Sequence, residues 1–271
     1  MPAPPSARSD RSWWRAAWRR AVRQRLGIWR SVAIYNLKPF NQRRLRRFYG
    51  PLIRPGSLCF DVGAHVGNRT RAWLDLGARV VSVEPQPACI RVLRQAFAGR
   101  ERWQLCPRAI GEHPGQAELI IASLNPAVST LSRSWQRDIA ALDRVEVPWD
   151  ETVTVEVTTL DQLVEMHGVP DFCKLDVEDF ELPALRGLSR ALPALSYEFY
   201  PTTMAKAVAC LDRLQELGDY RYNWSIAESL RMESQRWLSA ADMRARLRAY
   251  TGRRSGDVYA RLGHFFSESY T

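Results

Sequence analysis

The sequence predicts an α/β domain with a mostly parallel sheet and helices on both faces, preceded by a basic helical arm. Short apolar runs alternate with helical patterns after residue 55, and strands separated by helices usually pair in parallel. The chain has 271 residues and is 46% hydrophobic, which is enough to bury the core of one domain. We therefore expect an arm over residues 1–50 and one domain over residues 51–271.

Basic residues are concentrated near the N-terminus. Residues 1–54 contain fourteen Lys or Arg side chains and one acid, Asp10, whereas the rest of the chain contains 25 basic and 28 acidic side chains. The formal net charge of +10 therefore belongs to the arm, and the domain itself is slightly acidic. This distribution argues against a nucleic-acid surface across the domain.

Apolar side chains recur at helical spacing within the arm. Trp14, Trp18, Leu26 and Trp29 fall on one side of a helix, and arginines occupy the other faces. The sequence leaves three interpretations open for this amphipathic helix. Residues 12–36 lie on an anionic membrane, or the Trp stripe packs onto the domain or onto a second copy in a homodimer, or the arm is an organellar presequence.

Cysteine and histidine usage is typical of a protein without disulfides or zinc. The five cysteines form no CxxC pair, and the four histidines have no zinc-ligand spacing. We also find no apolar run long enough to span a bilayer and no secretory signal. We expect a cytoplasmic protein that is soluble or peripheral at a membrane.

Five apolar runs are predicted as the parallel strands of the sheet, at residues 58–62, 80–83, 103–106, 172–177 and 194–199. Between the third and fourth runs, residues 112–158 form an insertion with β character. Two final strands are expected at 220–224 and 257–261. The insertion therefore separates the two halves of the sheet along the chain.

The first predicted strand ends in a glycine turn that opens a helix, Asp61-Val62-Gly63-Ala64-His65-Val66-Gly67-Asn68. Backbone N–H groups in such a turn approach a ligand closely. The G-x-x-x-G spacing and the preceding Asp61 argue against a dinucleotide, whose phosphates would meet a carboxylate. Glu84 follows Gly63 by 21 residues and ends the next strand, where it can accept both ribose hydroxyls. These features predict an S-adenosylmethionine site.

Acidic residues lie at the ends of the fourth and fifth predicted strands, where ligands of open α/β sheets bind. Methyl transfer to a hydroxyl requires a base, so Asp176, Glu178 and Glu198 are candidate catalytic residues. The alternative for Glu178 is an acid in the first turn of the next helix, which is what we expect of Asp179 and Glu181. No spacing specifies a metal site, and no metal ligand is predicted.

These motifs resemble those of the FkbM-type methyltransferases, a Rossmann-like family that methylates mainly hydroxyl groups of sugars, glycolipids and polyketides. The resemblance extends over residues 48–262. It rests on the segments 60–68, 83–85, 108–111, 159–161, 174–178 and 197–199. One departure is Asp179, which stands where the family usually has glycine after the Glu, so the turn geometry that sets the role of Glu178 differs from the family pattern.

The resemblance implies a class I methyltransferase fold with seven strands in the order 3-2-1-4-5-7-6 and an antiparallel last hairpin. It also implies that residues 63–70 hold the methionine part of the cofactor, that Glu84 holds the ribose, and that Ala109 and Ile110 line the adenine side. The candidate cofactor-binding residues are Asp61, Gly63, Ala64, His65, Gly67, Asn68, Thr70, Glu84, Pro85, Ala109 and Ile110.

The leading hypothesis is an O-methyltransferase that acts on a saccharide or a lipid-linked glycan, with residues 112–158 shaping the acceptor pocket. Sugar-stacking candidates are Trp135, Trp149, Tyr197 and Trp224. The arginines motivate an RNA or DNA methyltransferase as a rival, although the chain lacks the Asn/Asp-Pro-Pro-aromatic run of base N-methylation. A cofactor-binding scaffold without catalysis is the third hypothesis, and it predicts lost cofactor residues.

Overall fold

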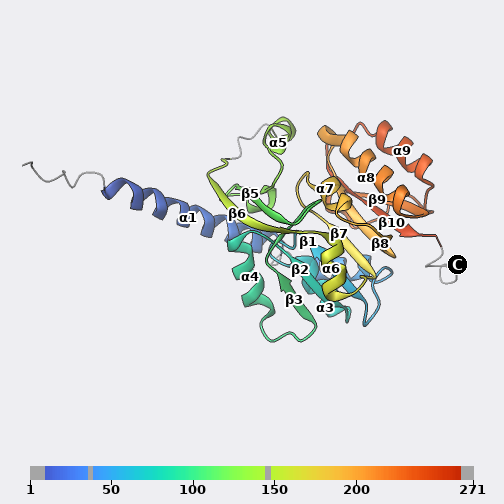
Figure 1. Ribbon diagram of the computed structural model, residues 1–271, viewed down its shortest axis with the longest axis horizontal. Coiled ribbons are helices and arrows are strands. Elements are labelled where there is room, and N and C mark those ends of the chain that lie inside the picture. The colour runs from blue at the N-terminus through green and yellow to red at the C-terminus, as the bar shows by residue number, and fades with distance from the viewer. Residues whose placement is uncertain (1–9, 36–38, 144–147, 264–271) are drawn as a thin grey trace, which may run out of the picture.

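A seven-stranded sheet forms the centre of the computed structural model, which describes residues 10–35, 39–143 and 148–263 (Figure 1). The strand order is β3-β2-β1-β7-β8-β10-β9. All neighbours pair in parallel except β10, which is antiparallel to β8 and β9. Counting only these strands, the order is 3-2-1-4-5-7-6, so the predicted topology is confirmed. The strands are β1 Leu58–Val62, β2 Arg79–Val83, β3 Trp103–Cys106, β7 Phe172–Leu175, β8 Ala194–Phe199, β9 Tyr220–Ile226 and β10 Gly256–Leu262.

Helices cover both faces of the sheet because successive strand side chains point to opposite sides. Phe60 belongs to the core under α6 Leu160–His167, α7 Glu181–Arg186, α8 Met204–Leu217 and α9 Ala240–Ala249. The adjacent Cys59 belongs to the core under α2 Asn41–Tyr49, α3 Asn68–Asp75 and α4 Pro87–Phe97. Two apolar cores therefore sandwich the sheet.

Helix α2 is part of the packed domain. Leu45 and Tyr49 are buried, and the Tyr49 ring lies 5.3 Å from Trp73 and 5.9 Å from Phe172, measured between ring centroids. The expected boundary at residue 50 does not coincide with a break in packing, because α2 carries its own apolar side chains into the core. The packed domain begins at α2.

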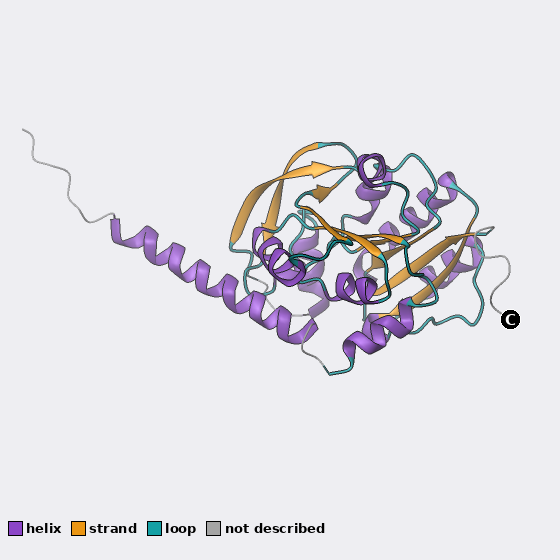
Figure 2. Cartoon of the chain, turned by 90° about the horizontal axis from the view of Figure 1, so that it is seen from below, coloured by secondary structure: helices purple, strands orange, loops and turns teal. Residues whose placement is uncertain are grey.

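Helix α1, Asp10–Tyr35, projects from the domain and touches it along one side (Figure 2). A Cβ on Gly27 would lie 2.0 Å from the backbone oxygen of Ser123, so this face of α1 packs directly on the segment before the 3₁₀ helix η1, Pro126–Val128. Trp18 and Trp29 are 63% and 70% exposed. At Trp18 and Trp29, where the structure describes the stripe, these side chains do not pack onto the domain, and Gly27 on the opposite face makes that contact instead. No helix among the described residues is long and apolar enough to cross a membrane.

A second, three-stranded sheet has the order β4-β6-β5. The insertion supplies β5 Gly115–Ile121 and β6 Glu151–Thr158, and β4 Ala109–Ile110 lies just before it. Helix α5, Trp135–Asp143, follows β5 along the chain. Its Trp135 packs on Tyr200 with the ring centroids 4.2 Å apart. The insertion thus contacts the segment that follows β8.

Replacing Tyr49 by Ala tests whether α2 belongs to the core. We expect the free energy of unfolding to fall by about 3 kcal/mol, because a large aromatic side chain is removed from a packed site. Phe40→Ala is the matched control, since Phe40 is 75% exposed, and it should leave stability nearly unchanged. Denaturant unfolding measures both, and equal small losses would show that α2 is a peripheral part of the arm.

Candidate active site

The glycine turn after β1 brings two strand ends into direct contact. Gly63 has a φ of +81°, and a Cβ there would lie 1.8 Å from the backbone oxygen of Asp176. Only glycine combines this backbone conformation with so close an approach. The turn after β1 and the end of β7 therefore form one continuous wall.

A buried polar network supports the turn from below. The Thr70 hydroxyl donates to Asp61 Oδ2 at 2.5 Å and lies 2.7 Å from the Ser82 hydroxyl, and Trp103 Nε1 donates to Ser82. Burial raises the pKa of Asp61, and the Thr70 hydrogen bond opposes that rise. Asp61 and Thr70 therefore hold β1, β2 and α3 together beneath the site.

Glu84 at the end of β2 points its carboxylate into a cavity. Its two oxygens accept backbone N–H groups of His65 and Gln86, each at 2.8 Å. Each oxygen keeps a second lone pair, so the carboxylate can still accept hydroxyl groups of a ligand. Burial raises the pKa of Glu84 to about 7.

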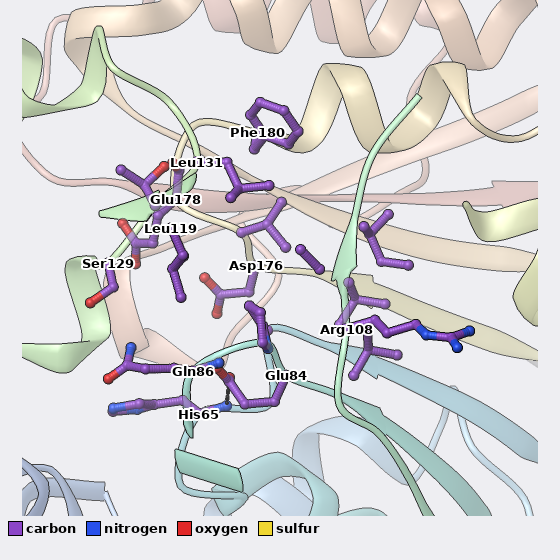
Figure 3. A pocket seen from close by; sticks show the side chains of 18 of the residues that line it. His65, Glu84, Gln86, Arg108, Leu119, Ser129, Leu131, Asp176, Glu178 and Phe180 are labelled. Carbon is purple, nitrogen blue, oxygen red and sulfur yellow. Dashed lines mark hydrogen bonds between the residues drawn. The ribbon is translucent and has the colours of Figure 1, made fainter. Parts of the chain in front are cut away.

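The cavity beside Glu84 has the polarity expected for an adenosine (Figure 3). Pro85, Ala109, Ile110 and Phe180 contribute apolar walls on which a planar base can lie. Gln86 is buried, and its Oε1 has no hydrogen-bond partner among the described residues. A ligand donor would satisfy this oxygen. These residues fit a nucleoside bearing a cationic amino-acid part, as predicted for S-adenosylmethionine.

The predicted cofactor residues separate into three groups by position. The cavity beside Glu84 is lined by Gly63, His65, Glu84, Pro85, Ala109 and Ile110. Asn68 lines the neighbouring cavity instead. The remaining four line neither cavity and are buried: Ala64 and Gly67 within the turn, and Asp61 and Thr70 on the strand and helix that flank it. These four residues therefore shape the turn and do not line either cavity.

Asp176 is an ionised carboxylate held by two cations. Lys174 Nζ lies 3.3 Å and Arg69 Nη1 3.4 Å from Asp176 Oδ2. Burial opposes ionisation of Asp176, but these two charges hold its pKa well below the usual range. Lys174 is itself buried and also pairs with Asp257 at 2.6 Å. The sequence pattern placed Asp176 at the site but gave no sign of Asp257.

Glu178 and Glu198 have the opposite electrostatic environment. Burial, followed by the nearby charge of Asp176, raises the pKa of each well above its ordinary value. The Tyr200 hydroxyl donates to Glu178 Oε2 at 2.8 Å and fixes that carboxyl group. Tyr200 was missed by sequence reasoning, although it lies two residues after Glu198, at the spacing that shares a strand face.

The turn that follows β7 is held in the left-handed region at two successive residues, Glu178 (φ 53°) and Asp179 (φ 72°). Aspartate tolerates this conformation better than most residues, so Asp179 can stand where glycine is usual. Its carboxylate pairs with Lys206 and accepts from Ser132 Oγ at 2.7 Å. Asp179 therefore lies before α7 and anchors the turn. We expected both Asp179 and Glu181 to be acids in the first turn of this helix, and only Glu181 lies there.

A second cavity of about 510 Å³ adjoins the first. Both cavities are lined by Gly63, His65, Ala127, Asp176 and Glu178, and the second also contains Glu198 and Tyr200. Asp176 and Glu178 therefore lie where the cavities meet, and Glu198 lies beside them in the second cavity. Tyr35 at the end of α1 also lines the second cavity, so the arm contributes to its wall.

The predicted sugar-stacking aromatics do not line the second cavity as the structure describes it. Trp135 and Tyr197 are fully buried, and the Tyr197 hydroxyl donates to the Ala207 carbonyl. Trp224 packs against Phe199 and Tyr250. The sugar-stacking assignment is wrong for Trp135 and Tyr197, because both side chains are buried in the core.

The three acids also have a spacing that a divalent cation can bridge. One carboxylate oxygen from each of Asp176, Glu178 and Glu198 lies within 4.8 Å of the others, and no other such group occurs among the described residues. Lys174 and Arg69 already balance the charge of Asp176. These residues could hold a metal, and they could equally hold a proton between carboxyl groups.

Three features together define an S-adenosylmethionine-dependent methyltransferase. They are the fold, the G-x-x-x-G turn preceded by Asp61, which does not suit a dinucleotide phosphate, and the acid Glu84 after β2. A family model described as the methyltransferase FkbM domain matches residues 61–223. The chain belongs to the FkbM methyltransferase family, and S-adenosylmethionine is its cofactor. No curated protein matches the sequence.

Solved methyltransferase structures are distantly similar to this chain. A TehB-like S-adenosylmethionine-dependent methyltransferase from Corynebacterium glutamicum shares 14% identity, with 91% of this chain and 98% of that chain covered and a TM-score of 0.46. A putative O-methyltransferase from Klebsiella pneumoniae shares 9% identity, with 97% and 91% covered and a TM-score of 0.42.

Cofactor affinity should depend on pH through Glu84. The carboxylate form accepts ribose hydroxyls, so affinity should approach its full value about one pH unit above the Glu84 pKa of about 7 and fall by up to about tenfold per unit below it. His65 does not titrate in this range, because burial lowers its pKa to about 4. Isothermal titration with S-adenosylmethionine between pH 5.5 and 8.5 measures the effect.

Glu84→Gln provides the control for that titration. At pH 8 this variant should bind S-adenosylmethionine roughly 10 to 100 times more weakly than the wild type, because a charged hydrogen-bond acceptor is lost. Its affinity should no longer change with pH. Equal pH profiles for wild type and variant would contradict the ribose-binding role of Glu84.

Proposed function

We propose that the protein is an O-methyltransferase whose acceptor hydroxyl binds in the second cavity and loses its proton to Glu178. The observation that carries this proposal is the position of the acids at the junction of the two cavities. A scaffold that had lost catalysis would be expected to lose such residues, whereas both the cofactor cavity and the acid cluster are intact.

S-adenosylmethionine supplies an electrophilic methyl group when bound. The remaining requirements are to orient the hydroxyl and to remove its proton. Glu178 is suited to take the proton, because it lines both cavities and its raised pKa makes it a stronger base than an ordinary carboxylate. Asp176 stays ionised and can accept a hydrogen bond from the acceptor. Glu198 lines the acceptor side and can hold the proton that the pair already shares, which leaves Glu178 ionised and able to take the proton of the acceptor hydroxyl.

The acceptor class that we propose is a hydroxyl of a saccharide, a glycolipid or a related metabolite. Family resemblance supports it, together with the polar lining of the second cavity, which includes Asn68, Arg69 and Tyr200. The insertion supports it too, because α5 packs on Tyr200 and thereby reaches the site. Methyl transfer from labelled S-adenosylmethionine to glycan, lipid and RNA fractions tests this class. Transfer to RNA alone would overturn it.

The base is tested by Glu178→Gln. We expect kcat to fall by about 10² to 10⁴, because a positioned proton acceptor is lost, while the affinity for S-adenosylmethionine stays within a factor of two of wild type. Tyr200→Phe keeps the ring and removes the hydrogen bond to Glu178, so it should give a smaller loss. Unchanged turnover by Glu178→Gln would remove Glu178 from the mechanism.

We also propose that α1 rests on an anionic membrane. At 100° per residue, Trp18, Leu26 and Trp29 lie within about 80° of one another, on the face opposite Gly27. All three are more than half exposed. Exposed arginines, among them Arg30, flank this face. An exposed apolar stripe bordered by cations is suited to the interface of anionic lipids.

Replacing Trp18, Leu26 and Trp29 together by Ser tests the membrane contact. Binding to phosphatidylglycerol vesicles should weaken by at least about tenfold, because the apolar area that enters the interface is lost. Cofactor affinity should not change. The control is Met166→Ser with Val169→Ser, two exposed apolar residues on the domain, which should bind vesicles like wild type.

Vesicle sedimentation and solution mass are measured on the same samples. A wild-type dimer that the triple substitution converts to a monomer, without vesicle binding by either protein, would assign the stripe to a second copy of the chain. Undiminished vesicle binding by the triple variant would contradict any role of the stripe.

A further inference from the structure

A third cavity, separate from the two at the active site, is formed by α2, the segment after η3 Ala227–Ser229, and the end of β10. Its volume is about 580 Å³, which lies in the range of small-molecule sites. The η3 segment divides it from the acceptor cavity, because Glu228 lines the acceptor cavity and Ser229 lines this one.

Four arginines line this cavity, namely Arg44, Arg47, Arg231 and Arg261, and none of its described lining residues is acidic. Four guanidinium groups around one cavity repel one another unless an anion balances them. Arg47 makes no ion pair with a described residue, and the nearest paired carboxylate oxygen to Arg231, from Glu233, is 4.0 Å away. Arg47 and Arg231 therefore bring positive charge to the cavity that none of its described lining residues neutralises.

Two of these guanidinium groups are held in place. Arg44 Nη2 donates to the backbone oxygens of Glu228 at 3.1 Å and Ser229 at 3.2 Å. The guanidinium carbon of Arg261 lies 4.3 Å from the centre of the Trp237 ring. Fixed guanidinium groups lose little side-chain entropy when they bind an anion.

We propose that this cavity binds a phosphoryl group attached to an apolar body. Arginine pairs of N–H donors match the oxygens of phosphate, which explains the choice of Arg over Lys. Phe48, Leu52, Met232 and Trp237 provide apolar lining beside the cations. A lipid phosphate and a soluble phosphate ester both have this chemistry.

Isothermal titration of the full chain with two probes tests the proposal, using inorganic pyrophosphate and dihexanoyl phosphatidic acid below its micelle concentration. Both should bind, and their affinity should fall with salt. Phosphatidic acid that binds at least ten times more tightly than pyrophosphate would identify a lipid headgroup as the source. The reverse preference would identify a soluble phosphate.

Arg47→Gln should weaken the binding of both probes by at least about tenfold, because it removes a charged donor. Arg190→Gln is the matched control, an exposed arginine outside the cavity, and should bind like wild type. Unchanged S-adenosylmethionine affinity verifies that each variant is folded. Absence of binding by both probes, or equal binding by Arg47→Gln and wild type, would overturn the site without affecting the proposed methyl transfer.

Discussion

The buried ammonium group of Lys174 is the constraint on which the active site depends. It lies at the centre of the sheet with 1% of its side chain exposed, and it requires compensating charge there. Asp176 supplies that charge from the end of β7, and Asp257 supplies it from β10. With Asp176 ionised, ionisation of both neighbouring glutamates becomes costly, since like charges at this spacing raise one another's pKa. Burial and this structural charge together therefore favour a proton held at the junction of the cavities.

The cofactor side of the site is built on a different principle. Glu84 is positioned by two backbone N–H groups and pairs with no cation among the described residues, so burial raises its pKa. The two halves meet where Gly63 contacts the backbone of Asp176. This close approach brings the cofactor turn and the acid cluster to one point, and a side chain at residue 63 would separate them.

Much of this arrangement was predictable from local sequence. Strand periodicity and the rule that ligands bind at the carboxyl ends of strands identified Glu84, Asp176 and Glu198. The partners that tune these acids were not predictable, because Asp257 reaches Lys174 only through the register of a strand 83 residues away. The burial of Trp135 was equally hidden, since an aromatic side chain in an insertion has the same sequence pattern whether it faces a ligand or the core.

Infrared difference spectroscopy of the carboxyl groups tests the central claim most directly. Wild-type protein at pH 7 should show a protonated carboxyl band that weakens in Glu178→Gln or Glu198→Gln. The band should also lose intensity in Asp176→Asn, because that change removes the charge that disfavours ionisation of the two glutamates. Comparing variants with wild type separates this band from that of Glu181, whose pKa burial raises to about 8. If the band at pH 7 is the same in wild type and in both glutamate variants, no proton resides between these acids and the account is contradicted.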